Sequence, residues 1–359
     1  MKLEKDVFLN KDRASRIYYF DILRIIAIVA VMALHIAGQN WRSTDVSTSE
    51  WMIFNVADSV TRWGVPVFVM ISGALFLGGE KSIGQIYKKN VSRIAVALFT
   101  WSATYMIVSA CYNGIDANTM IKEFALGHFH LWFLYMIIGL YMIVPVIRPM
   151  TSSQKSVKYF LVIAFFVTFL IPEVVQILKL NHEFASSIVS GLLSHMSFYV
   201  PLGYLGYFVL GYYLNQIQIS LELELIIYLL GVCGFLFTVF ATGYVSRHLG
   251  EAYDAFYYNL TCNVLFESIS IFVLAKKRLS KLCSRIKIRK IVLVLSSWSF
   301  GAYLVHALVL EEFDRRFLLN TMSYHPAITV PMLLILVGVI SFAVSALLNC
   351  IPVIKKWIV

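Results

Sequence analysis

Three ionisable side chains lie within one apolar stretch near the start of the sequence. The segment FDILRIIAIVAVMALHIAG, residues 20–38, contains Asp21, Arg24 and His35. Histidine exchanges a proton readily near neutral pH, and arginine carries a permanent positive charge that suits anions and polarised carbonyl groups. Charges in lipid are costly, so such residues in a membrane span are candidates for function. The segment therefore predicts proton transfer beside a fixed positive charge.

The spacing of these residues places them along one side of a helix. Asp21 and Arg24 are three positions apart, which allows an ion pair. Arg24 and His35 differ by only ~20° after three helical turns and by ~16 Å in height, about half the hydrocarbon core. We expect one polar stripe from near the inner rim to near the outer rim. The alternative is that Asp21 and Arg24 anchor the helix end while His35 lies among the outer headgroups.

Two later segments add further candidates near the outer rim. HFHLWFLYMIIGLY contains His128, His130 and Trp132, and SSWSFGAYLVHALVLEEF contains Tyr303 and His306. The two histidines of the first segment are two positions apart and are expected to point in different directions, which argues against a metal pair. Tyr303 and His306 share a helix face, and both a packing role and a functional role are open for them.

The segment KSIGQIYKKNVSR, residues 81–93, contributes positive charge at the opposite rim. Its Lys88, Lys89 and Arg93 are candidates for binding an anionic group, although ordinary loop charges would give the same pattern. Ser72 and Gly73, in the preceding span, are small enough for close helix contact. Two acidic residues inside apolar spans each need a partner that the sequence does not identify: Glu173 and Glu267.

The elements that position these residues are predicted to be membrane helices. The 359-residue chain is 59% hydrophobic and only 14% charged, with a mean hydropathy of +0.77. Soluble domains carry roughly 25% charged residues, so most of this surface is expected to face lipid. We predict an all-α polytopic transmembrane bundle of about ten helices, because backbone groups in lipid must bond internally. The predicted spans are 17–38, 59–78, 94–112, 131–149, 158–178, 198–216, 224–244, 258–275, 292–311 and 327–350.

The distribution of Lys and Arg predicts the orientation of the bundle. With the N-terminus inside, 22 of the 30 residues fall in inside segments and 7 in outside segments. Both termini are therefore expected in the cytoplasm, with residues 1–16 and 351–359 as cytoplasmic segments. The basic run 276–290 fits the anionic inner leaflet, so the net charge of +10 predicts a lipid bilayer and no nucleic acid as partner.

Composition argues for one membrane domain over residues 1–359. The predicted loops are short, and the first apolar segment is expected to be a retained helix, since no A-x-A cleavage site follows it. The cysteines are far apart and are read as free thiols, without a zinc signature. They are Cys111, Cys233, Cys262, Cys283 and Cys350. We expect no metal.

Five segments in order resemble the membrane acyltransferase-3 family. They are the Arg24-x10-His35 pair after Asp21, VFVMISG (67–73), YKKNVSRI (87–94), HLWFLYMIIGLY (130–141) and SFGAYLVH (299–306). The resemblance covers about residues 16–310. It is closest to the subgroup of enterobacterial common antigen O-acetyltransferase and the intercellular-adhesin modification proteins. The proline that usually follows the basic motif is absent, because Ile94 is followed by Ala95.

The resemblance implies transfer of an acyl group, usually acetyl, from cytoplasmic acyl-coenzyme A to a sugar hydroxyl outside. The family's essential arginine and histidine correspond to Arg24 and His35. His35 is expected to act as a base or, less often, to carry the acyl group. Arg24 would polarise the thioester carbonyl or hold the donor's polar arm, with Asp21 setting its rotamer.

The resemblance also assigns the remaining candidate residues to the acyl donor or to the acceptor. The acetyl-coenzyme A site would contain Lys88, Lys89 and Arg93. The acceptor, a surface glycan or its lipid-linked precursor, would contact Trp132, His130, Tyr303 and His306. The expected location is the inner membrane of a bacterial cell; the oligomeric state stays open. Two alternatives remain: a transporter or flippase for a glycan or an amino acid, and a structural subunit of an export complex.

Overall fold

A computed structural model describes residues 16–182, 190, 203–280 and 286–359. The described residues form helices and connecting turns and contain no strand, which confirms the predicted all-helical bundle. The helices are α2 (Tyr18–Gly38), α3 (Ser49–Ser59), α4 (Gly64–Leu77), α5 (Ile83–Gln85), η1 (Ile86–Val91), α6 (Ser92–Asn113), α7 (Ala117–Leu126), η2 (Phe129–Leu131), α8 (Trp132–Ile147), η3 (Arg148–Ser152), α9 (Gln154–Ala164), η4 (Phe165–Leu170), α10 (Ile171–Asn181), α13 (Leu205–Gln216), α14 (Leu221–Leu249), η5 (Ala255–Tyr257), α15 (Cys262–Arg278), α16 (Ile286–Phe317), α17 (Pro326–Asn349) and α18 (Pro352–Trp357).

Nine helical segments within the described residues are long and apolar enough to cross a membrane. They correspond to nine of the ten predicted spans. The remaining span, 198–216, begins among residues outside the description, and its described part is the twelve-residue α13. The chain is therefore a multi-pass membrane protein, and the expected number of about ten helices agrees with the described elements.

The largest boundary difference lies in the second span. The predicted range 59–78 begins ten residues too late, because helical structure starts at Ser49 and is interrupted between α3 and α4. Polar residues such as Glu50, Asn55 and Asp58 lower the hydropathy of this first part, so a hydropathy criterion does not include it in the span. At the interruption, Gly64 packs against α2, where an added Cβ would lie 3.1 Å from Val31. The break therefore brings residues 60–63 close to the middle of α2.

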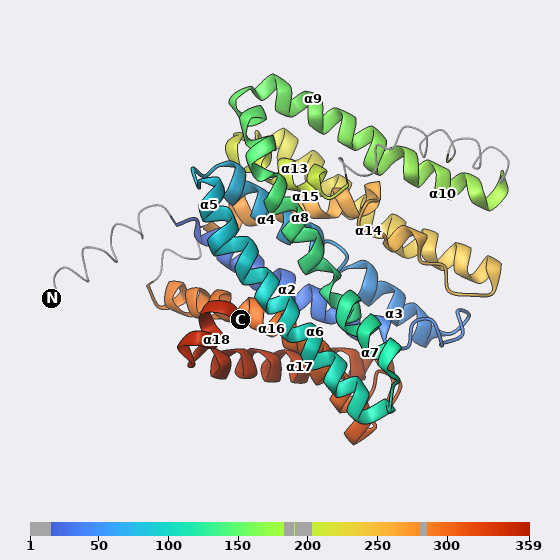
Figure 1. Cartoon of the computed structure of the whole chain (residues 1–359). Coiled ribbons are helices and arrows are strands. Elements are labelled where there is room, and N and C mark those ends of the chain that lie inside the picture. The colour runs from blue at the N-terminus through green and yellow to red at the C-terminus, as the bar shows by residue number, and fades with distance from the viewer. Residues whose placement is uncertain (1–15, 183–189, 191–202, 281–285) are drawn as a thin grey trace.

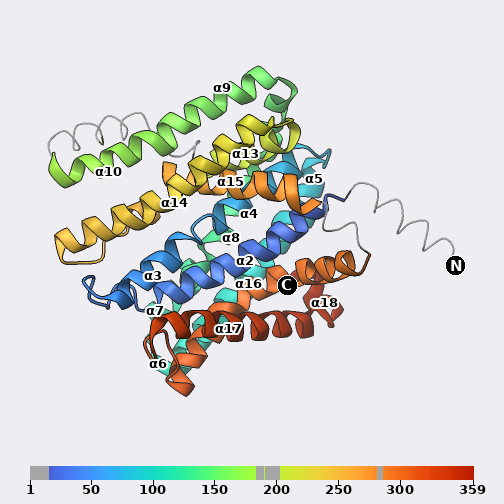
Figure 2. The ribbon, with the colours of Figure 1, turned by 180° about the vertical axis from the view of Figure 1, so that it is seen from behind.

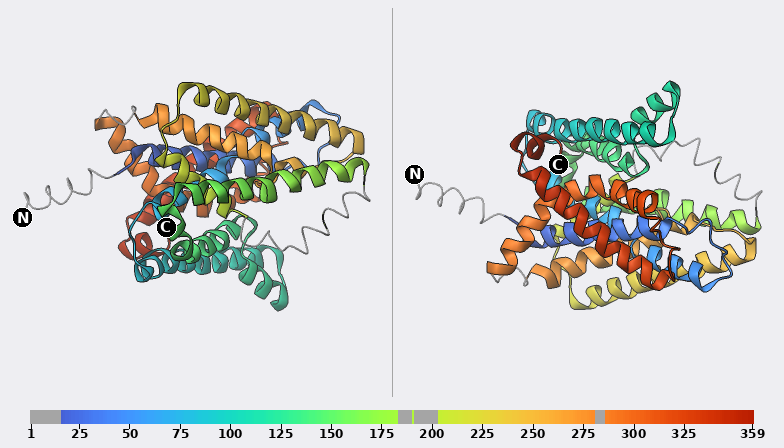
Figure 3. Two further views of the ribbon diagram at one scale, coloured as in Figure 1. Left: turned by 90° about the horizontal axis from the view of Figure 1, so that it is seen from above. Right: turned by 90° about the horizontal axis from the view of Figure 1, so that it is seen from below.

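Helix α2 lies at the centre of the bundle. It contacts α3, α4, α15, α16 and α17, which come from widely separated parts of the sequence. Figures 1 and 2 show α2 running between the layer of α13, α14 and α15 and the layer of α16 and α17. Helices α9 and α10 cover one outer face and α17 lies at the opposite one (Figure 3). A helix surrounded in this way can hold polar residues away from lipid.

The two ends of the bundle are named here by the short helices that mark them. The start of α2, α5 and α18 lie at one end, called the α5 end (Figure 1). The loop between α2 and α3 and the helix α7 lie at the other, called the α7 end (Figure 1). Arg24 is therefore near the α5 end of α2, and His35 is near the α7 end.

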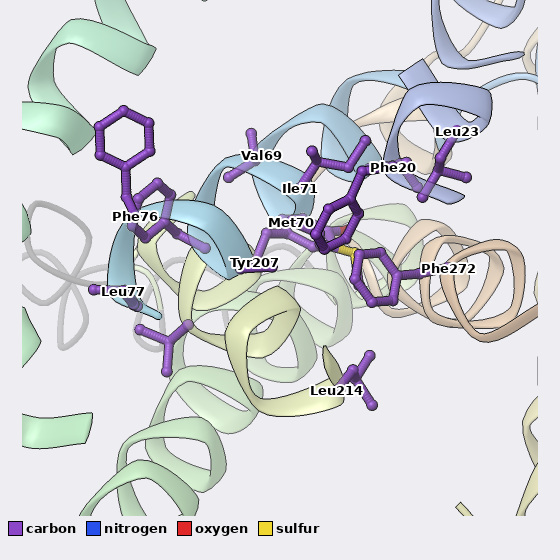
Figure 4. Packing of buried hydrophobic residues seen from close by; sticks show 14 of the residues in the cluster. Phe20, Leu23, Val69, Met70, Ile71, Phe76, Leu77, Tyr207, Leu214 and Phe272 are labelled. Atoms are coloured by element: carbon purple, nitrogen blue, oxygen red, sulfur yellow. The ribbon is translucent and has the colours of Figure 1, made fainter. Parts of the chain in front are cut away.

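The closest helix crossing joins α4 to α13. Gly73 lies against the backbone of Phe208, and Gly211 lies against the backbone of Met70. Around the crossing, aromatic and aliphatic side chains from α2, α4, α13 and α15 form a buried core that includes Phe20, Tyr207 and Phe272 (Figure 4). The expected close helix contact at Gly73 is confirmed, and it joins α4 to α13.

Candidate active site

A basic cavity opens among the helices at the α5 end. Its volume is about 430 Å³, and its polar lining includes the cations Arg24, Lys81 and Arg93. Most of the remaining wall consists of Asn90, Ser72, Ser299 and aromatic side chains of α4, α8 and α16, among them Tyr303. The lining therefore combines three positive charges with apolar and aromatic surface. This arrangement suits a ligand with an anionic head and a less polar arm.

Asp21 binds Arg24, one of the cations of this cavity, but does not line the cavity itself. The carboxylate is buried and accepts two hydrogen bonds of 2.9 Å from Arg16. Ser296 Oγ donates a further bond of 2.7 Å, and Arg24 Nη1 lies at 3.3 Å. The predicted Asp21–Arg24 pair is confirmed. Its geometry makes Asp21 an orienting partner for Arg24, since the arginine is the member that lines the cavity.

The basic segment 81–93 is divided between the cavity and the surface. Lys88 and Lys89 are exposed and are absent from the cavity lining, whereas Arg93 lines it. The reason is that the segment is helical rather than a loop, with Ser82 capping α5 and a π-helical turn in η1. Lys81 and Asn90 line the cavity instead, and sequence reasoning missed both.

His35 is paired with His306 on α16. His35 Nδ1 and His306 Nε2 are 2.7 Å apart, and the rings are stacked with centroids 5.0 Å apart. His306 Nδ1 lies 2.5 Å from the carbonyl oxygen of Tyr303. That oxygen only accepts, so Nδ1 of His306 carries a proton, and its Nε2 in the neutral ring accepts from His35 Nδ1–H. The lone pair of His35 is then on Nε2.

The other histidines lie against this pair. His130 is buried, and its ring centroid is 5.1 Å from that of His306. The Tyr303 hydroxyl donates to the backbone carbonyl of His130. The expectation that His128 and His130 point apart is wrong: their Nδ1 atoms are 3.0 Å apart, because His128 has an extended backbone before the 3-10 turn η2 and the two residues do not share an α-helix. No group of three or more metal-ligating side chains exists among the described residues.

Two cavities at the α7 end share His35. The charged cavity, about 500 Å³, is lined by acidic and basic residues of α3 and α16, among them Asp58, Glu311 and Arg315. The aromatic cavity, about 570 Å³, is lined by four aromatic residues together with Glu173, Gln176 and Asn259. Those four are Trp132, Tyr204, Tyr257 and Tyr258. Leu34, His35 and Arg62 line both cavities, so a molecule in either cavity can contact His35.

The basic cavity lies close to the charged and aromatic cavities. Val65 lines both the basic cavity and the aromatic cavity. Val31, also in the basic cavity, precedes His35 by one helical turn, ~6 Å. The sequence-predicted stripe thus has a cavity at Arg24 and another two at His35. Trp132 and Tyr303 line different cavities, and His130 and His306 lie behind His35 without belonging to the lining of these three.

Arg62 and Asp58 are functional candidates that sequence reasoning missed. The guanidinium of Arg62 forms an ion pair with Asp58, and Arg62 lines the two cavities that His35 also lines. The signal available in the sequence was their i,i+4 spacing just before an apolar span. The two unassigned acids also have partners: Glu173 accepts from the Cys262 amide at 2.9 Å, and Glu267 lies 3.2 Å from Thr238 Oγ1.

Comparison with known proteins identifies the family. A family model described as an acyltransferase domain, that of acyltransferase family 3, matches residues 17–350. No curated protein and no solved structure matches the chain. The match includes α2 with Arg24 and His35, the basic cavity, and α16 with Tyr303 and His306. The chain therefore belongs to acyltransferase family 3 and is a membrane acyltransferase.

Proposed function

We propose that this protein is an O-acetyltransferase that moves an acetyl group from acetyl-coenzyme A at the α5 end to a sugar hydroxyl at the α7 end. The observation that carries the proposal is the alignment of the basic cavity with the His35–His306 pair along α2. One side supplies positive charge for a polyanionic donor, and the other supplies a base. Family membership favours this function over a transporter or an export subunit.

The α5 end is assigned to the cytoplasm of a bacterial inner membrane, with both termini of one domain on that side. The support is the positive-inside distribution of charge together with contacts among the predicted inside segments. Arg148 donates to the Lys81 carbonyl at 2.7 Å, and Arg93 donates to the Val359 carbonyl at 2.6 Å. Acetyl-coenzyme A then reaches the basic cavity from the compartment where it is made.

Donor binding divides between the head group and the thioester arm. Lys81 and Arg93 at the mouth would meet the phosphates, and the ring-lined interior would hold the pantetheine arm. Arg24, oriented by Asp21, would hold the polar arm or polarise the thioester carbonyl. Lys88 and Lys89 remain proposed contributors through long-range attraction, because their side chains are exposed beside the same mouth.

The tautomers of the histidine pair leave the Nε2 lone pair of His35 available to act as the base in acyl transfer. The sugar hydroxyl attacks the thioester carbonyl as its proton moves to His35 Nε2. The C–S bond then breaks, the coenzyme A sulfur takes the proton from His35, and an ester and a thiol leave. His306 stabilises the charged ring by keeping its Nε2 as acceptor for His35 Nδ1–H. Trp132, with the tyrosines of the aromatic cavity, would pack against the acceptor.

The first test replaces the base. We expect His35→Ala to lower kcat by roughly 10²- to 10⁴-fold while acetyl-coenzyme A still binds, since only proton transfer is lost. Acetyl content of the cell-surface glycan by mass spectrometry measures the product. His248→Ala, an exposed histidine on α14, is the matched control and should change nothing. Full acetylation by His35→Ala at normal expression would refute the proposed base.

The second test compares two pairs of cations. Lys81→Ala with Arg93→Ala should raise the KM for acetyl-coenzyme A by at least ~10-fold, because these side chains line the cavity. Lys88→Ala with Lys89→Ala should have the smaller effect, and one that added salt removes. The measurement is initial rate against donor concentration in detergent. Equal effects of the two pairs would contradict the cavity as the donor site.

A further inference from the structure

We propose that the acceptor is a chain of sugar units that passes over Phe129, with the reacting unit at His35 and a further unit in a separate cavity between α6, α7 and α16. The inference rests on the proposed function and adds a second binding subsite to it. The separate cavity, called here the α6–α7 cavity, has a volume of about 320 Å³. Its lining includes Tyr105, Ser109 and Glu123, none of which lines the charged or the aromatic cavity.

The α6–α7 cavity adjoins the charged cavity at a shared wall. This wall consists of Phe129, Glu311 and Arg315, which line both cavities. Phe129 is 57% exposed, and the side chains of Glu311 and Arg315 are 28% and 30% exposed, so the wall is partly open to solvent. A molecule bound at His35 can therefore extend across the wall into the α6–α7 cavity.

The volumes of the two cavities fit more than one sugar unit. The charged cavity has about 500 Å³ and the α6–α7 cavity about 320 Å³. Each value lies in the range of pockets that hold a whole small ligand, ~300–1,000 Å³. One sugar unit therefore leaves the second cavity unfilled, whereas a chain occupies both.

Phe129 is placed to hold the unit that follows the reacting one. Its ring centroid is 5.1 Å from that of His35, and the two rings are nearly perpendicular, at 86°. A sugar ring has an apolar face, and packing that face on an aromatic side chain removes apolar surface from water. An exposed aromatic ring in a polar wall gains most from such a ligand, whose polar edges remain free for the neighbouring charged side chains.

The chain on either side of Phe129 is held in place. His128 Nε2 lies 2.8 Å from Glu311 Oε1. His130 is buried, and its carbonyl accepts a hydrogen bond from the Tyr303 hydroxyl. These contacts restrict the backbone at Phe129 before any ligand binds, which lowers the entropy lost on binding.

The polar groups of the α6–α7 cavity suit hydroxyls better than an anion. Glu311 Oε2 pairs with Arg315 Nη2 at 3.0 Å, and Glu123 accepts from Ser109 Oγ at 3.0 Å. An anionic ligand would meet two carboxylates for one guanidinium, which disfavours a polyanion such as coenzyme A. Sugar hydroxyls both donate and accept, so they can bond to the carboxylates and to the guanidinium.

The first experiment varies the length of the acceptor. Surface glycan from cells that lack this gene is cut by partial acid hydrolysis into fragments, from one sugar unit upward. Transfer from labelled acetyl-coenzyme A to each fragment is then measured in detergent. We expect kcat/KM to rise at least ~10-fold from the single unit to the longer fragments, because only a chain reaches the second subsite. Equal kcat/KM at all lengths would overturn the subsite, whereas no transfer to any fragment or to the intact glycan would refute the proposed function.

The second experiment removes the contacts of the subsite. Phe129→Ala and Glu123→Ala should each lower the ratio of kcat/KM for the longer fragments to that for the single unit, by at least ~3-fold. Phe129→Trp keeps an aromatic surface and should retain most of the native ratio. The dissociation constant for acetyl-coenzyme A should stay within twofold of the native value in all three variants, since the donor binds elsewhere.

Two control variants match the residues replaced. Glu50 in the first turn of α3 also accepts from a serine, Ser49 Oγ at 3.0 Å, but lines neither cavity. Phe240 is an exposed phenylalanine on α14. Glu50→Ala and Phe240→Ala should leave the ratio unchanged. A native ratio in the Phe129→Ala and Glu123→Ala variants would overturn the proposal, and so would an equal fall in the controls. Parallel loss of donor binding would also overturn it, because the replaced residues would then act on the fold.

Discussion

At the scale of single residues, the chemistry of His35 depends on a partner from another helix. The Tyr303 carbonyl sets the tautomer of His306, and His306 in turn sets that of His35. The chain of hydrogen bonds resembles the logic of a catalytic triad, in which a third group orients the base. In the proposed mechanism, His306 is accordingly a positioning residue, because it would act through His35 rather than on the substrate.

The positioning role predicts a specific kinetic change. His306→Ala should lower kcat by about tenfold or more, the value of a typical net hydrogen bond, while the KM for acetyl-coenzyme A stays unchanged. Initial rates at saturating donor and acceptor measure the effect. Because a misoriented base changes the ionisation that controls the rate, the pH–rate profile should shift as well. A fall in protein yield without either kinetic change would indicate a packing role instead.

At the scale of helices, the α4–α13 crossing holds the second span against α2. An added Cβ on Gly73 would lie 1.7 Å from the Phe208 carbonyl oxygen, and one on Gly211 would lie 2.0 Å from that of Met70. Backbone atoms cannot yield as a flexible side chain does, so the two helices would have to separate. Because Val65 lies in α4 and Arg62 lies just before it, separation there would also disturb the cavities.

This crossing predicts a difference between glycines. Gly73→Ala and Gly211→Ala should each destabilise the protein by roughly 1–3 kcal/mol or more, since overpacking forces a backbone shift. Gly139→Ala on α8, where a Cβ would meet nothing within 4 Å, is the control and should be neutral or slightly stabilising. Thermal unfolding in detergent, followed by tryptophan fluorescence, measures the relative stabilities of the three variants. Equal midpoints for Gly73→Ala and Gly139→Ala would contradict the tight crossing.

At the scale of the whole molecule, Lys and Arg residues that the sequence assigns to the cytoplasmic side bind helix ends. Lys276 Nζ binds three carbonyls at the end of α13, at 2.7–2.9 Å, and Arg278 pairs with Glu224 at 2.7 Å. These cations therefore tie helix ends together as well as setting the expected topology. The basic cavity, which we propose as the donor site, and the aromatic cavity, which we propose as the acceptor site, lie toward opposite ends of the bundle and share Val65 in their linings.

The proposed orientation predicts which positions react from outside the cell. In a cysteine-free variant, Leu318→Cys at the α7 end should react with a membrane-impermeant maleimide in intact cells. Lys88→Cys at the α5 end should react only after permeabilisation, because the proposed topology places it in the cytoplasm. Both side chains are exposed, so accessibility does not bias the comparison. Labelling of Lys88→Cys in intact cells would reverse the assignment.

The sequence by itself determined the features that depend on neighbours along the chain. Hydropathy over ~20 residues predicts a membrane helix, and helical periodicity predicts that Arg24 and His35 share a stripe with Asp21 beside Arg24. Both properties are local, so no knowledge of packing is needed. The same local logic failed where a helix changed type, as at His128 and His130 and in the segment from Lys81 to Arg93.

Only the tertiary structure decided which side chains meet across helices. The pairing of His35 with His306, the place of Lys81 in the basic cavity and the position of Arg62 beside His35 all join distant or separate elements. Such contacts depend on helix crossings like that of Gly73 with Phe208, where close backbone packing sets the relative rotation of neighbouring helices. Rotation about a helix axis changes which residues face a cavity without changing the hydropathy of the span, which is why sequence patterns alone did not reveal the complete site.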